Sequence, residues 1–198
     1  MLILGIDPGT ATVGYGMIEV NGKKELDLLD FGWIKTKKES KAEARLDIIY
    51  KEMRILIRTH KPDVLAIERL FFFRNQKTAM QVSQAVGVIM LAAAKHKTKI
   101  VEYAPAQIKL RISGNGRSDK DAMKKAVRGI LPIRSPKKKR THFDDVADAL
   151  AVAITHAIEV NGKRVKGKSL IIIFLLPFTF HLFTFQIILS SSQTLLNP

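Results

Sequence analysis

The opening of the chain constrains its fold more than any other stretch. Residues 1–20 read MLILGIDPGTATVGYGMIEV, in which an apolar run from Leu2 to Ile6 ends at a single carboxylate, Asp7. Such a run is typical of a strand buried on both faces of a sheet. The Pro-Gly pair that follows turns the chain, and the apolar residues of 13–20 predict a second strand. The sequence therefore predicts a hairpin that holds one acid at the rim of a buried sheet.

Two interpretations of Asp7 are open at this point. An aspartate before Pro-Gly often accepts a hydrogen bond from a nearby backbone N–H, which is a purely structural role in a turn. A carboxylate at the end of a buried strand can instead belong to a functional site. The second interpretation gains support because another acid, Glu68, also ends a short apolar segment, residues 64–67.

The rest of the pattern predicts strands that first follow one another and then alternate with helices. We expect strands at 26–36, 64–67 and 99–103, and helices at 41–59, 76–96, from Pro105 to about Gly114, from about Ser118, and at 143–159. Ser40 with Glu43, and Ser118 with Asp121, have the spacing of capping boxes. The pattern predicts an α/β domain with a mixed sheet of five strands, an antiparallel meander followed by parallel strands, flanked by helices.

The charge of the chain indicates its class of partner. Its 198 residues include 33 Lys and Arg against 18 Asp and Glu, a formal net charge of +15. So large an excess favours a polyanion, either nucleic acid or an anionic membrane surface. The chain contains no cysteine, which excludes disulfides and thiolate zinc sites.

Composition also divides the chain into three parts. We predict a folded domain over residues 1–160, a basic linker over 161–168, and an apolar C-terminal extension over 169–198, which contains no Lys, Arg, Asp or Glu. No basic region precedes the first apolar run, so we expect no signal peptide.

The extension admits two interpretations. Residues 170–189 are long enough to cross a bilayer as one helix, and the basic linker would then keep the domain on the cytoplasmic side of the membrane. Pro177, His181 and Gln186 weaken this segment as a tail anchor. We favour an atypical extension, such as one from a shifted reading frame, on a cytoplasmic protein.

The last predicted helix adds further acids. Asp145 and Asp148 are three residues apart and so share one helix face, which small and apolar neighbours place against the sheet. Acids in a first turn can simply favour the helix dipole. Asp144 fits that role best, because with Thr141 it has the T-x-x-D capping spacing.

A shared site for these acids would explain them better than separate structural roles. The candidates are Asp7, Glu68, Asp145 and Asp148. Carboxylates brought together without a counterion repel one another and resist ionisation. Hard divalent cations such as Mg²⁺ or Mn²⁺ prefer oxygen ligands and relieve that repulsion. An acidic metal pocket on a basic domain fits the cleavage of phosphodiesters.

Three motifs in this order resemble the RuvC family, the Holliday-junction resolvases of bacteria. They are G-I-D-P-G-T followed by V-G-Y-G, A-I-E-R-L-F, and D-x-x-D-A-L-A-V-A-I-T-H, spread over roughly residues 1–160. The resemblance implies the RNase H-like fold, with Asp7, Glu68, Asp145 and Asp148 as catalytic and metal-binding acids. Some members have His in place of Asp145; this chain keeps Asp, which makes His142 a bystander.

The resemblance also implies the chemistry. It implies an endonuclease that resolves Holliday junctions in homologous recombination and DNA repair. Two Mg²⁺ ions per active site, for which Mn²⁺ can substitute, would support paired hydrolytic nicks with 5′-phosphate and 3′-hydroxyl ends.

Candidate DNA-binding residues surround these motifs. Three successive phenylalanines follow Glu68 and cannot all enter one core, so at least one is exposed. The resemblance implies that Phe71 stacks on bases at the junction and that Lys109 and Lys120 lie close to the scissile phosphate. Further basic residues extend the positive field, namely Arg111, Arg117, Lys124, Lys125, Arg128 and the run at 137–140.

A junction offers two equivalent strands, which suits a homodimer with two symmetric sites. The resemblance implies that dimer, along with four-way junction DNA and a branch-migration helicase complex as partners. The small residues of the predicted helix at 76–96 favour it as part of the dimer interface. Three other functions stay open: an RNase H-like nuclease of other substrate preference, a non-catalytic DNA-binding module, and a kinase-like ATPase, which would need a second lobe.

Overall fold

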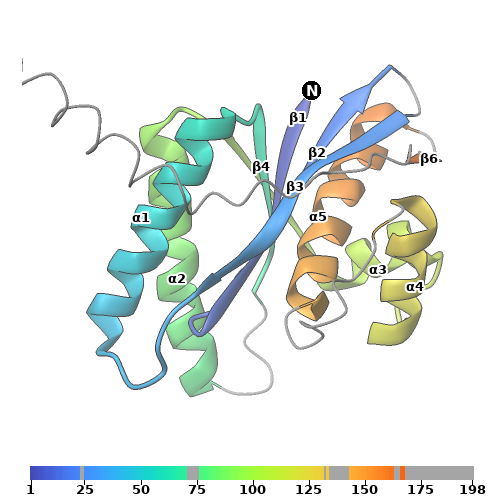
Figure 1. The fold of residues 1–198 in the computed structure, drawn as a ribbon. Coiled ribbons are helices and arrows are strands. Elements are labelled where there is room, and N and C mark those ends of the chain that lie inside the picture. The colour runs from blue at the N-terminus through green and yellow to red at the C-terminus, as the bar shows by residue number, and fades with distance from the viewer. Residues whose placement is uncertain (23–24, 71–75, 132, 134–142, 163–165, 168–198) are drawn as a thin grey trace, which may run out of the picture.

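The computed structural model describes the chain except for residues 23–24, 71–75, 132, 134–142, 163–165 and 168–198 (Figure 1). Several predictions therefore lie outside the described residues. They concern Phe71, the basic run at 137–140, Thr141 and His142, and the extension at 169–198.

The centre of the fold is one mixed β-sheet. Its strands are β1 (Leu2–Asp7), β2 (Thr12–Asn21), β3 (Glu25–Lys35), β4 (Val64–Glu68), β5 (Lys99–Tyr103) and β6 (Lys166–Gly167), in the order β5-β4-β1-β2-β3-β6. The first three strands form the predicted antiparallel meander, and β4 and β5 add to β1 in parallel. The predicted five strands are confirmed. β6 was not predicted, because two residues carry no periodic pattern.

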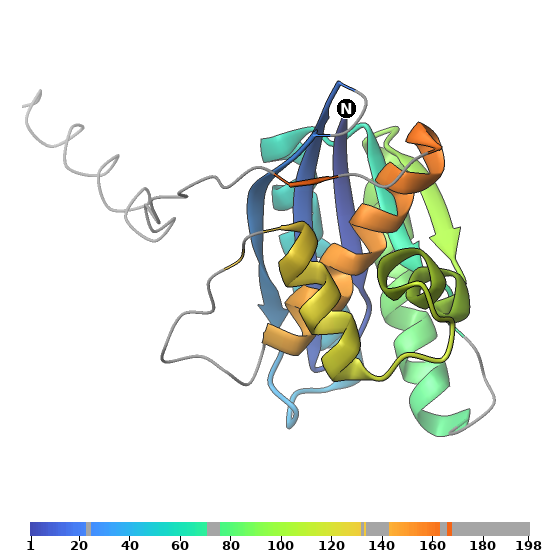
Figure 2. The same cartoon turned by 90° about the vertical axis from the view of Figure 1, so that its right-hand side faces the viewer.

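Helices cover both faces of this sheet (Figures 1 and 2). Their bounds are α1 (Ala42–His60), α2 (Gln76–Lys95), α3 (Pro105–Ser113), α4 (Lys120–Ile130) and α5 (Phe143–Asn161). One core lies between the sheet and the α1–α2 pair, and the other lies beneath α5, with α3 and α4 packed beside it. β1 contributes side chains to both cores. Ile3 packs in the core beneath α5 and Leu4 in the core beneath α1 and α2, because successive side chains of a strand point to opposite faces.

Two helix starts differ from the predicted caps. α1 has Lys41 as its N-cap and no side-chain cap, because the helix begins one residue later than the Ser40 motif needs. α4 begins after Asp119, whose Oδ1 accepts a hydrogen bond from the backbone N–H of Ala122 at 2.8 Å. Ser118 is buried instead, with its hydroxyl 2.7 Å from that of Ser113 at the end of α3.

Glycines allow α5 to lie directly on the sheet. A Cβ at Gly14 of β2 would collide with the carbonyl oxygen of Asp145, and one at Gly5 of β1 would collide with that of Ala149. Protein interiors leave no room for such an atom unless the helix moves. The sequence V-G-Y-G thus fixes the distance at which α5 packs, as well as forming a strand.

None of the helices in the described ranges is both long and apolar enough to span a bilayer. The candidate anchor at 170–189 lies outside those ranges and stays untested.

The packing of α5 generates a stability prediction. Gly14→Ala should lower the free energy of unfolding by about 1–3 kcal/mol, the usual cost of forcing an extra methyl into a tight contact. Urea denaturation would measure it. Gly129→Ala is the matched control, because Gly129 lies exposed in α4 and an added methyl there would meet open space, so alanine should be neutral or stabilising. Equal effects of the two changes would contradict this account of the helix–sheet contact.

Candidate active site

Asp7 and Glu68 lie side by side at one end of the sheet. β1 and β4 are parallel and pair Ile6 with Ile67, and each strand ends at its next residue. The carboxyl ends of neighbouring parallel strands share one edge of the sheet, so both acids emerge there. Glu68 also pairs with Tyr103 at the end of β5.

The start of α5 brings two more acids to the same edge. Asp7 pairs with Gly14 in the β1–β2 hairpin, and the backbone of Asp145 packs directly on Gly14. Asp148 is one turn further along α5. Acids that are separated by up to 141 positions in sequence, from Asp7 to Asp148, therefore lie close enough to influence one another's ionisation.

The electrostatics reflect this crowding. Burial raises the pKa of Asp7 to about 8, and the nearby charges of Asp148, Glu68 and Asp145 add to the effect. Burial and Asp148 likewise raise the pKa of Glu68, while burial is the main cause of a raised pKa at Asp148. The structure thus concentrates more negative charge than its own cations neutralise.

A cavity of about 270 Å³ opens beside these acids. Its lining combines carboxylates, lysines and apolar side chains: Asp7, Glu68, Asp119, Asp148, Lys109, Lys120, Pro105, Ile108, Met123 and Ala151. Three of the four predicted acids and both predicted lysines line it. Asp145 does not, although its charge acts on Asp7.

The sequence did not suggest Asp119 as a lining residue. Asp119 caps α4. It lines the cavity only because α4 packs beside α5. A capping aspartate carries no sequence signal that distinguishes it from an acid in a site.

Two lysines of α4 pair with two acids of α5. Lys120 Nζ lies 3.7 Å from Asp148 Oδ2, and Lys124 Nζ lies 2.8 Å from Asp144 Oδ1. Lys120 and Lys124 are one turn apart on α4, and Asp148 and Asp144 are one turn apart on α5. The two ion pairs therefore connect α4 to the start of α5. The predicted cap between Asp144 and Thr141 is untested, because Thr141 lies outside the described residues.

Two more of the predicted basic residues have partners in the structure. Arg111 forms an ion pair with Glu159, with Nε 2.7 Å from Oε1. The Arg128 guanidinium lies 4.6 Å from the centre of the Phe143 ring. Their charges still add to the positive field, but both side chains also hold helices together.

The donor set of the site suits a hard cation, since four carboxylates, Asp7, Glu68, Asp119 and Asp148, line the cavity together with only two lysines from the described part of the chain. Among the described residues, however, no three His, Cys, Asp or Glu side chains stand close enough together to share a metal ion as they are.

The raised pKa of Asp7 generates a pH prediction. Its folded-state pKa lies above the ordinary value of 3.8, so the folded protein holds a proton that the unfolded chain releases, and stability falls as pH rises between about 4 and 8. Asp7→Asn removes this penalty and should be more stable than the wild type at pH 8 without divalent cations. One pKa unit corresponds to about 1.4 kcal/mol, so even part of the shift would be measurable.

Thermal or urea unfolding at pH 5 and pH 8, with EDTA present, would measure the difference. It should shrink toward pH 5, and Mg²⁺ should stabilise the wild type at pH 8 more than the variant. A stability difference between the wild type and Asp7→Asn that does not change with pH would show that the Asp7 carboxyl does not have a raised pKa.

Known proteins resemble this chain in sequence and in fold. A family model described as crossover junction endodeoxyribonuclease RuvC matches residues 3–156. The protein of that name from Fusobacterium nucleatum is 39% identical over 169 residues, which cover 85% of this chain and 86% of the relative. The one from Prochlorococcus marinus strain MIT 9312 is 48% identical over 155 residues, covering 78% and 95%.

Solved structures agree. Thermus thermophilus RuvC in complex with a Holliday junction substrate superposes with a TM-score of 0.73 at 31% identity, covering 82% of this chain and 96% of that one. A yeast mitochondrial Holliday junction resolvase, 12% identical with a TM-score of 0.56, shares the fold.

Proposed function

The chain belongs to the crossover junction endodeoxyribonuclease RuvC family, and from that premise we propose that it resolves Holliday junctions by paired, metal-dependent hydrolytic nicks. The observation that carries the proposal is the meeting of acids from β1, β4 and α5 beside a cavity that also contains two lysines. This combination supports the proposal, because carboxylates can bind cations and lysines can bind phosphate. Its place in the cell would be the cytoplasm, in homologous recombination and DNA repair.

The four acids would hold the metal ions. Asp7, Glu68, Asp145 and Asp148 supply oxygen donors of the kind that Mg²⁺ prefers and Mn²⁺ accepts. Two bound ions would supply an activated water and stabilise the leaving oxygen, which gives 5′-phosphate and 3′-hydroxyl ends. The protein's own part is to keep these carboxylates together at a rigid sheet edge, with Asp7 deprotonated when it serves as a ligand.

Lys109 and Lys120 would contact the scissile phosphate. Both line the cavity, and both lower the pKa of Glu68, so their charges already act on the site. The Lys120 side chain is 73% exposed and only 3.7 Å from Asp148, a loose pairing that leaves it able to reach a phosphate. Phe71, which would stack on bases, lies outside the described residues.

Cleavage of a synthetic four-way junction tests the function. We expect nicks with Mg²⁺ and none with EDTA, and slower cutting of a linear duplex of the same sequence. Asp7→Asn should lower the rate by at least on the order of 10²-fold, the usual loss when charge stabilisation in an active site is removed. Gel-shift binding of the junction should survive, since Asp7 contributes no positive charge.

Asp47→Asn is the matched control, because Asp47 is an exposed aspartate of α1 that does not line the cavity. It should cut at close to the wild-type rate. Undiminished cutting by Asp7→Asn would contradict the metal-site assignment. Binding without any cutting would favour the non-catalytic DNA-binding module, and equal cutting of junction and linear duplex would favour a nuclease of other preference.

We also propose a homodimer that uses α2, because a junction presents two strands to cut. The outward side of α2 carries Met80, 65% exposed, and Leu91, 48% exposed, with exposed Gly87 and Ala94 between and beyond them. Small and apolar residues in a row permit close helix packing. Cooperation with a branch-migration helicase complex is part of the same proposal and rests on family membership alone.

Leu91→Glu should convert the dimer to a monomer, because it places a charge in the proposed apolar contact. Sedimentation of the purified protein would measure the change. Ile55→Glu is the matched control, since Ile55 is an exposed apolar residue of similar exposure, 49%, on the neighbouring helix α1. A dimer that survives Leu91→Glu would contradict the α2 interface.

A further inference from the structure

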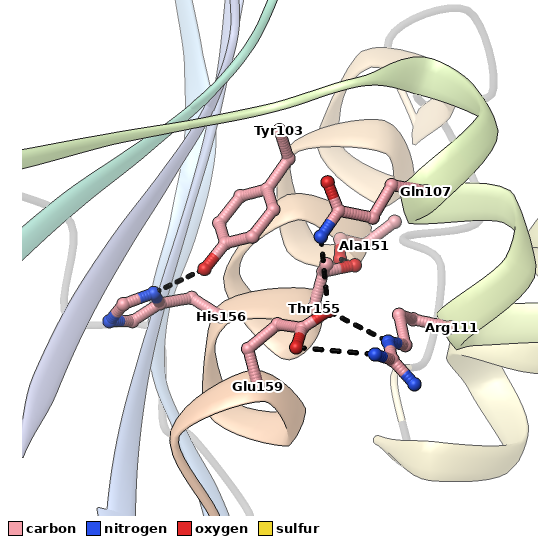
Figure 3. Close-up of polar contacts among 7 residues, drawn as sticks. All are labelled: Tyr103, Gln107, Arg111, Ala151, Thr155, His156 and Glu159. Carbon is pink, nitrogen blue, oxygen red and sulfur yellow. Dashed lines mark hydrogen bonds and ion pairs between the residues drawn. The ribbon is translucent and has the colours of Figure 1, made fainter. Parts of the chain in front are cut away.

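The far end of α5 holds α3 through one carboxylate. Glu159 Oε1 accepts hydrogen bonds from Arg111 Nε at 2.7 Å and from Gln107 Nε2 at 3.1 Å, and its Oε2 accepts one from Arg111 Nη2 at 3.3 Å (Figure 3). Both donors belong to α3. Hydrogen bonds from Arg111 and Gln107 also lower the pKa of Glu159, so its carboxylate stays ionised.

The same short helix carries a lysine of the acidic cavity. Gln107 and Arg111 are one turn apart and lie on one flank of α3, whereas Lys109 is offset from each by two residues, about 200° of helical rotation. It therefore lies on the opposite flank, where it lines the cavity and lowers the pKa of Glu68. Any rotation of α3 about its axis would move Lys109 relative to the acids.

Apolar packing alone would fix that rotation poorly. Ile108 and Ile112 anchor α3 in the core, but hydrophobic contacts are not directional. The bonds to Glu159 are charge-assisted and directional, and they come from two points one turn apart. With the hydroxyl contact between Ser113 and Ser118 at the end of α3, they define the setting of the helix in a way that two buried isoleucines do not.

Other contacts fix the frame to which α3 is attached. One turn before Glu159, His156 Nδ1 lies 2.6 Å from the hydroxyl of Tyr103, the last residue of β5 and the register partner of Glu68 (Figure 3). α5 thus carries acids near its start and contacts β5 through His156 and α3 through Glu159, which lie about 12 and about 17 Å beyond Asp148 along the axis at roughly 1.5 Å per residue. A change at Glu159 can therefore reach the cavity through α3 without touching any acid.

We propose that Glu159 is a positioning residue, whose contacts with Gln107 and Arg111 set the rotation of α3 and so direct Lys109 at the phosphate in the acidic cavity. The inference rests on the proposed nuclease function and assigns a role to a residue that the active site does not include. Arg111 and Glu159 are partly exposed, 46% and 27%, and such pairs contribute little to stability, so positioning can be separated from folding.

A double-mutant cycle between Glu159 and Lys109 tests this. Single-turnover cleavage of a synthetic four-way junction would be measured at saturating protein. Glu159→Ala should slow cleavage about 10-fold or more, the scale of loss expected from a misplaced group. In the Lys109→Ala background the same change should have no further effect, because the lysine through which it acts is gone.

Rescue and a matched control complete the test. The exchanged pair, Arg111→Glu with Glu159→Arg, should recover much of the rate that Glu159→Ala loses. Asp47→Ala removes another exposed ion pair, that of Asp47 with Lys51 on α1, and should leave the rate unchanged. Amide hydrogen exchange should rise in Pro105–Ser113 for Glu159→Ala and not for Lys109→Ala.

The outcomes separate the two proposals. A wild-type protein that leaves the junction intact contradicts the nuclease function. A wild-type protein that cuts, with Glu159→Ala cutting equally fast or slowing the Lys109→Ala variant further, contradicts only the positioning role. Unchanged exchange in α3 contradicts positioning whether or not the wild type cuts.

Discussion

The close approach of α5 to the meander is the constraint on which the rest of the molecule depends. Gly14 and Gly5 remove the side chains that would hold the helix away, and the backbone at Asp145 and Ala149 takes their place. With α5 seated there, Asp148 comes to the edge where β1 and β4 end, and α3 and α4 find a surface to pack on. A helix displaced outward by one methyl layer would separate these acids from Asp7.

The packing of α5 on the sheet brings acids together in a buried place, which disfavours their ionised forms. Burial at this edge raises the pKa of Asp7 to about 8, and the neighbouring acids oppose its ionisation further. The lysines of α4 neutralise this negative charge only in part, since Lys120 is 3.7 Å from Asp148 and Lys124 is paired with Asp144. A cluster of acids that is incompletely neutralised can bind cations. The net charge of +15 on the chain favours binding of a polyanion such as DNA.

Much of the fold was predictable because its signals are local. The buried run before Asp7, the apolar pattern of the strands and the helical spacing of apolar residues predicted the meander, the two parallel strands and the five helices of the described residues. The errors are also local: Lys41 rather than Ser40 precedes α1, and Asp119 rather than Ser118 caps α4. A shift of one residue changes which side chain can cap, and several polar residues in a row satisfy the same motif.

By itself, the sequence determined the strand ends at which Asp7 and Glu68 stand, the helix face shared by Asp145 and Asp148, and the motifs that identify the family. Only the tertiary structure decided which groups share the cavity: it added Asp119, paired Lys124 with Asp144, and joined Glu159 to α3. The physical reason is range. Periodicity records how each segment meets its own core, whereas contacts between segments far apart in sequence depend on how closely α5 packs on the sheet, a distance that no single segment encodes.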